Sequence, residues 1–212
     1  MALYFLLLDA DRLHQEIQPA LGACWQRRSF APALPLVQAL LPAAQAFADS
    51  HGLGESPLAA VPRGLAFDRQ RWRLVASEVL WFAAMEVPEV QTAPEATTWL
   101  LAPGSDRNAP RAQQPLIQHA YRGAHDLVFG QAVHAPDRVG VNERDDVARI
   151  GEYLAAVDHQ RWTVDELAGW DAELTADDLE DELDCAREWF PALRDVYLRA
   201  QANGQVVVCE EV

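Results

Sequence analysis

The sequence predicts a helix-rich α+β fold, and three observations support this prediction. Residues 2–8 form an unbroken apolar run of strand length. Residues 205–209, Gln-Val-Val-Val-Cys, form a second segment with strong β propensity. Most of the chain between them repeats apolar residues at helical spacing. Because strands that are buried on both faces have continuous apolar sequences, we expect the two terminal strands to pair in a small sheet covered by helices.

The first half of the chain reads as a series of helices. After a cap at Asp9 or Asp11, we expect a helix that Pro19 bends or ends, and then a helix over 35–48 that Pro42 bends. Residues 51–64 have a loop composition. The strongest helical pattern runs from about residue 68 to 86 and is apolar over most of its circumference, which predicts a central helix. Residues 97–101 are a short strand candidate.

The second half contains clearer helix signals. Residues 125–133 fit a strand or a short helix. Asn142 is expected to cap one helix, and the capping box from Thr163 to Glu166 begins a short one. Thr175 caps the next helix, which Pro191 either breaks or follows with a further helix. The dipeptide 203–204, Asn-Gly, is a helix stop.

Length and composition predict a single domain over residues 1–212. Of the 212 residues, 50% are hydrophobic and 23% are charged, as is usual for a globular chain. A chain of this size buries roughly 70% of its unfolded surface, so one core suffices without disulfides. Residues 102–115 contain three prolines and a glycine, and we interpret them as a hinge or a long surface loop.

The charge and the cysteines indicate a cellular setting. The formal net charge is −15, all 17 basic residues are arginine, and the absence of lysine excludes a lysine Schiff base or a P-loop lysine. Three cysteines without a CxxC pair favour a reducing, cytoplasmic location. The N-terminus lacks signal-peptide features, and no apolar run approaches the roughly 20 residues of a membrane helix. We therefore expect no nucleic-acid or membrane partner, and no cofactor.

An acidic segment from residue 171 to 188 is the most informative local feature. It holds nine acidic residues and a single base, Arg187. Apolar residues anchor one helix face, so the acids are expected to project from the others. This face either keeps the protein in solution or docks a basic protein. We favour a protein-interaction module, one form of which is an immunity protein that neutralises a basic toxin. The candidate interaction residues are Asp177, Asp178, Asp181, Glu182 and Trp170.

The alternative hypothesis is a small-ligand-binding protein or enzyme with a pocket near Glu78 and the segment 119–134. A carboxylate on an apolar helix face can act as a general acid or base, or it can pair with an arginine such as Arg71 or Arg122. The segment adds His119, His125 and His134, whose spacing matches no compact metal-ligand motif. No nucleophile or phosphate-binding motif is present, so no catalytic residue and no metal ligand is assigned. A subunit of a homo-oligomer is a third possibility, and the oligomeric state is left open.

The C-terminal part of the chain resembles the YfbM-like group of uncharacterised bacterial proteins. The matching residues are Trp189-Phe190, Leu193, Val196-Tyr197, Ala200, Gly204 and Val206-Val207-Val208, preceded by Asp145-Asp146-Val147-Ala148 through Tyr153-Leu154. The resemblance covers roughly residues 125–209. It implies an α+β fold, and it assigns neither an activity nor a catalytic residue.

Overall fold

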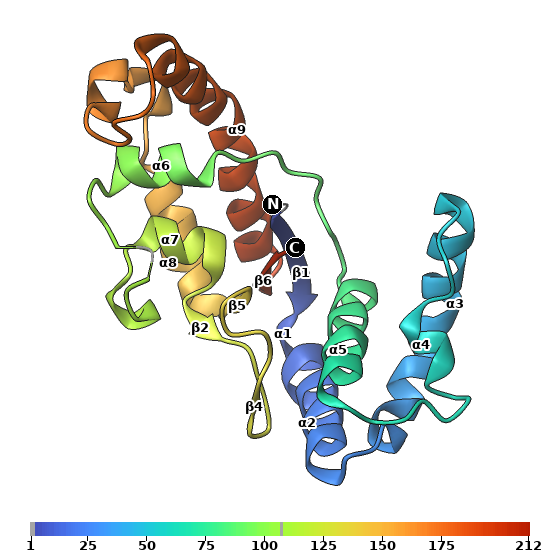
Figure 1. The fold of residues 1–212 in the computed structure, drawn as a ribbon. Helices are drawn as coiled ribbons and strands as arrows, with labels where there is room; N and C mark the ends of the chain where they lie inside the picture. The colour runs from blue at the N-terminus through green and yellow to red at the C-terminus, as the bar shows by residue number, and fades with distance from the viewer. Residues whose placement is uncertain (1–2, 107) are drawn as a thin grey trace. The chain divides into compact units, whose positions relative to one another are not determined.

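The structure is a computed structural model that describes residues 3–106 and 108–212, and the chain divides into two compact units (Figure 1). Unit 1 comprises the described parts of Met1–Phe5, Pro88–His125 and Arg138–Val212. Unit 2 comprises Leu6–Val87 and Asp126–Asp137. The described residues of the segment 102–115 lie inside unit 1 and include the 3-10 turn η3 (Arg111–Gln113).

A four-stranded sheet contains both ends of the chain, which confirms the predicted α+β class. Its strand order is β1 (Leu3–Asp9), β6 (Gln205–Glu211), β5 (Val139–Asn142) and β2 (His125–Asp126). The strands β5 and β6 are antiparallel, with Val141 opposite Val208. The two terminal apolar runs are thus neighbouring strands, and the middle residues of β6 are fully buried.

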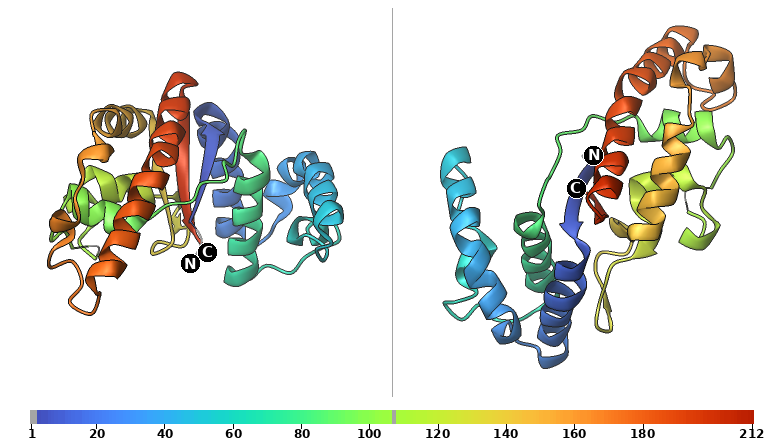
Figure 2. Two further views of the ribbon diagram at one scale, coloured as in Figure 1. Left: turned by 90° about the horizontal axis from the view of Figure 1, so that it is seen from above. Right: turned by 180° about the vertical axis from the view of Figure 1, so that it is seen from behind.

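Four helices of unit 1 accompany this sheet. They are α6 (Pro94–Leu101), α7 (Leu116–Arg122), α8 (Arg144–Ala155) and α9 (Ala176–Ala202), with the 3-10 turns η4 (His159–Arg161) and η5 (Val164–Leu167) before α9. The helices α8 and α9 pack against each other and against β6, and Figure 2 shows α9 as one long helix. The expected break at Pro191 is wrong. The residues on either side, Phe190 and Leu193, are buried in the core, and this packing offsets the hydrogen bond that proline cannot make.

Two further expectations in unit 1 are corrected. Residues 97–101 lie in helix α6, not in a strand, because Pro94 opens a helix in which Thr97 is buried and hydrogen-bonds Tyr121. The cap of α8 is Glu143, one residue after the expected Asn142. The Asn142 side chain is buried and bonds the core instead.

Unit 2 is a helical unit with a two-stranded hairpin. Its helical elements are α1 (Ala10–Arg12), the π-turn η1 (Leu13–Ile17), α2 (Gln18–Arg27), η2 (Ala31–Ala33), α3 (Leu34–His51), α4 (Pro57–Ala60) and α5 (Arg69–Ala83). The hairpin pairs β3 (Val128–Phe129) with β4 (Ala132–Val133). Asp9 caps α1, and Pro19 does not end the helical run. It lies in the first turn of α2, directly after the π-turn, where a missing N–H donor is tolerated.

The predicted central helix corresponds to α5, which Asp68 caps. Its buried face includes Trp72, whose indole nitrogen donates to the Leu21 carbonyl oxygen at 3.1 Å. The apolar surface of this segment is not fully covered, since Leu74 is 50% exposed and Met85, just after the helix, is 68% exposed. The helix α5 therefore forms the core of unit 2 on one face only.

The helical stretch Ala31–His51, which includes α3, is long and apolar enough to cross a membrane by length and composition. The sequence predicted a helix over 35–48 but did not identify it as long and apolar enough for a membrane span, because Gln38 and Gln45 interrupt the apolar run. Core helices of soluble proteins and signal sequences have the same properties, so this is weak evidence for a membrane span. In unit 2, α3 packs against α4 and α5.

Candidate functional site

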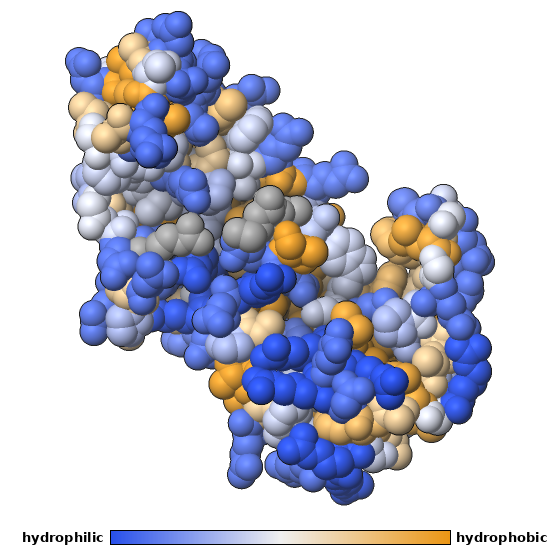
Figure 3. All heavy atoms as spheres, viewed as in Figure 1, coloured by the Kyte–Doolittle hydropathy of each residue, from blue (hydrophilic) through white to orange (hydrophobic). Residues whose placement is uncertain are grey.

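The first half of α9 separates an acidic face from a buried face. Successive helical residues are turned by about 100°, so residues spaced by three and four share a side. Leu183, Ala186 and Phe190 form the buried side. On the opposite side lie five exposed acids, which we name the acidic stripe: Asp177, Glu180, Asp181, Asp184 and Glu188. Figure 3 shows hydrophilic side chains over the end of unit 1 where α9 begins, with a few apolar ones among them.

The negative charges of the acidic stripe are almost unpaired with basic side chains of the described chain. Asp184 lies 3.5 Å from the guanidinium of Arg187 and is itself 79% exposed. Within residues 3–106 and 108–212, the other four acids of the stripe form no ion pair. Like charges at this spacing repel each other, which makes the helix less stable unless water or a partner screens them.

The other candidate interaction residues lie outside the acidic stripe. Asp178 is engaged locally, because its carboxylate accepts from the Thr175 hydroxyl at 2.7 Å and from the Thr175 N–H at 2.9 Å. These bonds form the capping box of α9 and lower the pKa of Asp178. Glu182 is half-exposed on the flank of α9, and Trp170 is half-exposed in the segment between η5 and α9.

The pKa of the Cys185 thiol responds to the negative charges of neighbouring acids on α9. Burial raises its pKa, and the charges of Glu182, Glu188, Asp181 and Asp184 raise it further. Each carboxylate disfavours a neighbouring thiolate, so the four contributions have the same sign. The acids therefore act together on a group of the same helix.

Glu78 is half-buried and holds the start of the short helix α4. Its carboxylate accepts from the Ser56 hydroxyl at 2.5 Å and from the Leu58 N–H at 3.2 Å. These donors take the place of the arginine that the sequence suggested, and Arg71 pairs with Asp68 at 3.3 Å instead. In this arrangement Glu78 ties α4 to α5 within unit 2.

The three candidate histidines have separate surroundings. His134 belongs to unit 2, where its Nε2 lies 3.3 Å from the Ser77 hydroxyl. His119 belongs to unit 1, with its Nε2 2.7 Å from the Arg111 carbonyl oxygen. His125 also belongs to unit 1, and its Nε2 lies 2.8 Å from the carboxylate of Asp146. Among the residues that the structure describes, no group of three or more His, Cys, Asp or Glu side chains could hold a metal ion.

The pairing of His125 with Asp146 is a feature that sequence reasoning missed. Asp146 is 4% exposed and also binds the guanidinium of Arg149 and the Glu143 N–H. A buried carboxylate thus orients an imidazole whose side chain is 57% exposed. The available signal was the position of Asp146 in the first turn of α8, where a capping-box residue is expected.

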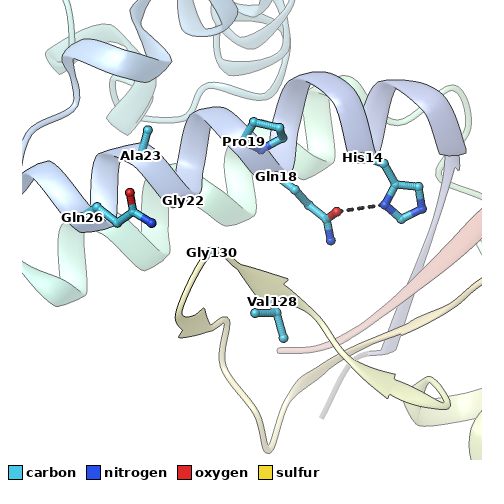
Figure 4. A pocket seen from close by; sticks show the side chains of 8 residues that line it. All are labelled: His14, Gln18, Pro19, Gly22, Ala23, Gln26, Val128 and Gly130. Atoms are coloured by element: carbon cyan, nitrogen blue, oxygen red, sulfur yellow. Dashed lines mark hydrogen bonds between the residues drawn. The ribbon is translucent and has the colours of Figure 1, made fainter.

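A shallow hollow of about 280 Å³ lies on unit 2 between α2 and the hairpin (Figure 4). It is lined by His14, Gln18, Pro19, Gly22, Ala23, Gln26, Val128 and Gly130. His14 and Gln18 are joined by a hydrogen bond of 2.8 Å. The lining includes neither Glu78 nor any of the three candidate histidines, and it contains no carboxylate.

Comparison with known proteins shows the fold and no activity. A scan against protein-family profiles and a search of curated proteins give no match. Among solved structures, the chain is similar to the crystal structure of YfbM from Escherichia coli, a protein of unknown function. The similarity covers 100% of both chains at 13% identity, with a TM-score of 0.50. The resemblance to the YfbM-like group is thus confirmed as a likeness of fold, and it extends beyond residues 125–209.

Proposed function

We propose that this protein is a binding protein whose acidic stripe on α9 docks a basic protein partner. The observation that supports the proposal best is the near absence of internal compensation along the stripe. Five exposed acids share one side of a helix whose other side is fixed in the core, and one of the five has an ion-pair partner within the described chain. Such a face attracts positive charge and speeds diffusional encounter with it.

Two half-exposed tryptophans, one just before α9 and one on α9, favour arginine on the partner. Trp170 lies in the chain just before α9 and Trp189 lies on α9, and both side chains are half-exposed. An indole ring beside carboxylates can stack on a guanidinium that the carboxylates also bind. Aromatic anchors of this kind commonly dominate binding energy at protein interfaces.

A protein that neutralises a basic toxin is the concrete form of this proposal. Such a protein needs a rigid, strongly acidic face, and catalytic machinery of its own is not required for that role. The net charge of −15 and the stripe on a core-anchored helix meet this need. A toxin-like reading frame next to the gene would support this form of the proposal.

The test is affinity capture at low salt from extracts of the source organism with three immobilised proteins. These are the wild type, a stripe variant with Asp177, Glu180, Asp181 and Asp184 changed to Arg, and a control variant with Glu89, Asp137, Glu152 and Asp165 changed to Arg. Both variants alter the net charge equally, and neither changes the capping residue Asp178. We expect one basic protein to be retained by the wild type and the control and lost by the stripe variant.

The captured protein is then purified and its contact surface on this chain is mapped by hydrogen exchange. New protection on residues 176–190 supports the proposal. Equal retention by the stripe variant, or protection confined to other elements, contradicts it. Failure of the wild type to retain any basic protein at low salt also counts against it.

A further inference from the structure

The hairpin of unit 2 contacts α5 through the buried histidine His134 and through Phe129. His134 follows β4 directly and is 1% exposed. Its backbone N–H closes the hairpin by donating to the Leu127 carbonyl oxygen at 2.8 Å. Its ring reaches Ser77 on α5, with 3.3 Å between Nε2 and the hydroxyl oxygen. His134 therefore both closes the hairpin and links it to α5.

Aromatic rings enclose the His134 imidazole. The ring centroid of Trp72 on α5 lies 5.7 Å away, and that of Phe129 on β3 lies 5.5 Å away. The Trp72 and Phe129 rings also contact each other edge-on at 5.8 Å. These contacts suit a neutral imidazole, because a charged ring would lose its water on every side.

The hydrogen bonds of His134 leave no place for a second ring proton. Its Nδ1 is buried and has no hydrogen-bond partner within the part of the chain that the structure describes. A protonated imidazole needs two acceptors, one for each ring N–H. Protonation would therefore add an unsatisfied donor as well as a buried charge.

The charged groups around His134 do not compensate a positive ring. On α5 the group that faces it is Arg73, whose guanidinium opposes a second cation, while Glu78 on the same helix binds Ser56 and Leu58. On the hairpin, Asp126 and Asp137 are exposed. On α2, which packs against β3, burial raises the pKa of Cys24 to about 11, so that thiol stays neutral.

We propose that His134 is a pH-sensitive fastening, and that its protonation releases the hairpin segment 126–137 from α5 while the helices of unit 2 remain folded. Release lets the imidazole reach water, and it exposes Phe129 and one face of Trp72. The backbone pairing of the hairpin is short, since each of its strands pairs over two residues, so the buried side chains of Leu127, Phe129 and His134 hold it in place. The exposed aromatic rings would form an apolar surface on unit 2 that exists at acidic pH only.

The direction and the size of the pH effect on hairpin opening follow from the pKa of the His134 imidazole. Burial, followed by the charge of Arg73, lowers the pKa of His134 from 6.5 to about 4. The open hairpin thus binds the proton more tightly than the closed one, so the attachment is complete above about pH 6.5 and weakens as the pH falls toward 4. This difference corresponds to a rise of roughly a hundred-fold in the opening equilibrium between pH 7 and pH 4.

The test compares hydrogen exchange in the hairpin segment 126–137 and in α5 from pH 7 to pH 4, corrected for the intrinsic pH dependence of exchange. Three full-length chains are used: the wild type, His134→Phe, and His125→Gln as a control for an exposed histidine of unit 1. In the wild type and the control, we expect hairpin protection to fall roughly a hundred-fold toward pH 4 while α5 keeps its protection. In His134→Phe, the protection of the hairpin should not follow this pH dependence.

Three results would overturn the proposal. His134→Phe could show the wild-type pH dependence, α5 could lose protection together with the hairpin, or the hairpin could stay closed at pH 4. If His134→Phe fails to fold, the wild type still decides the question through the ¹³Cε1 resonance of His134. A titration midpoint that coincides with the loss of hairpin protection supports the proposal, and separate midpoints contradict it.

Discussion

The amide of Asn142 donates to the phenol oxygen of Tyr197 at 2.8 Å and joins the end of β5 to α9 in the core of unit 1. The same amide donates to the His119 carbonyl oxygen at 2.9 Å, and its oxygen accepts from the Ala124 N–H at 2.8 Å. Tyr197 in turn donates to the Ala120 carbonyl oxygen at 2.6 Å. Both side chains are fully buried, so this network fixes α7, β5 and α9 relative to one another within unit 1.

Replacement of Asn142 by alanine should destabilise the protein by about 2–4 kcal/mol. The change leaves the Ala124 N–H without its acceptor and removes a donor from Tyr197, and unsatisfied buried groups of this kind are costly. Chemical denaturation measures the loss. Asn203→Ala, at the exposed end of α9, should change stability by less than about 0.5 kcal/mol. Equal effects of the two substitutions would contradict the network.

A side chain at position 140 should be poorly tolerated. A Cβ atom on Gly140 would overlap the Arg122 carbonyl oxygen and lie 2.6 Å from Nη1 of Arg111, which itself donates to carbonyl groups of this turn. We expect Gly140→Ala to cost about 3 kcal/mol or more, because the backbone must move. Gly54→Ala is the matched control, since nothing lies within 4 Å of its Cβ position. Thermal unfolding of both variants checks the difference.

Glu78 should contribute to stability. Its bonds to Ser56 and Leu58 hold α4, so Glu78→Ala should destabilise the protein by about 1–2 kcal/mol, and Glu78→Gln by less. A carboxylate that is kept for binding or catalysis at the expense of stability would behave in the opposite way. An increase in unfolding free energy for either variant would therefore revive the hypothesis of a pocket near Glu78.

The reactivity of Cys185 should report the acidic field directly. Burial and then the neighbouring carboxylates raise its pKa, so Glu182→Gln should lower that pKa, increase the thiolate fraction at pH 8 and speed alkylation. Glu173→Gln, an exposed acid that does not act on Cys185, should leave the rate unchanged. Burial raises the pKa of Cys24 to about 11 and that of Cys209 to about 12, so these thiols should contribute little. A rate that is insensitive to Glu182→Gln and to added salt would show that the field is weak.

The parts of the fold that the sequence predicted are those with local signals. The terminal apolar runs identified β1 and β6, and the capping residues Thr163 and Thr175 identified the starts of η5 and α9. Helix α6 was mistaken for a strand because Thr97 and Thr98 are β-branched, whereas burial of Thr97 against Tyr121 decides its structure. The strand β5 was not recognised, since Gly140 weakens its β propensity and the partner strand lies far away in sequence.

The candidate site shows the same division. The acids of α9 were located from the sequence because Leu183 and Ala186 define the buried side of one helix, which leaves the acids on the outer sides. The pairing of His125 with Asp146 and the enclosure of His134 by Trp72 and Phe129 depend on contacts between distant segments. Residue spacing does not identify the partners of either histidine, so these contacts required the structure.

The most direct test of the docking proposal is the association rate of the captured basic partner with the wild type, the stripe variant and the control variant, measured at low and at high salt. We expect the stripe variant to associate at least about ten-fold more slowly at low salt, with the difference fading as salt increases, while the control stays close to the wild type. Equal association rates for the stripe and control variants would contradict the assignment of the α9 stripe as the docking face.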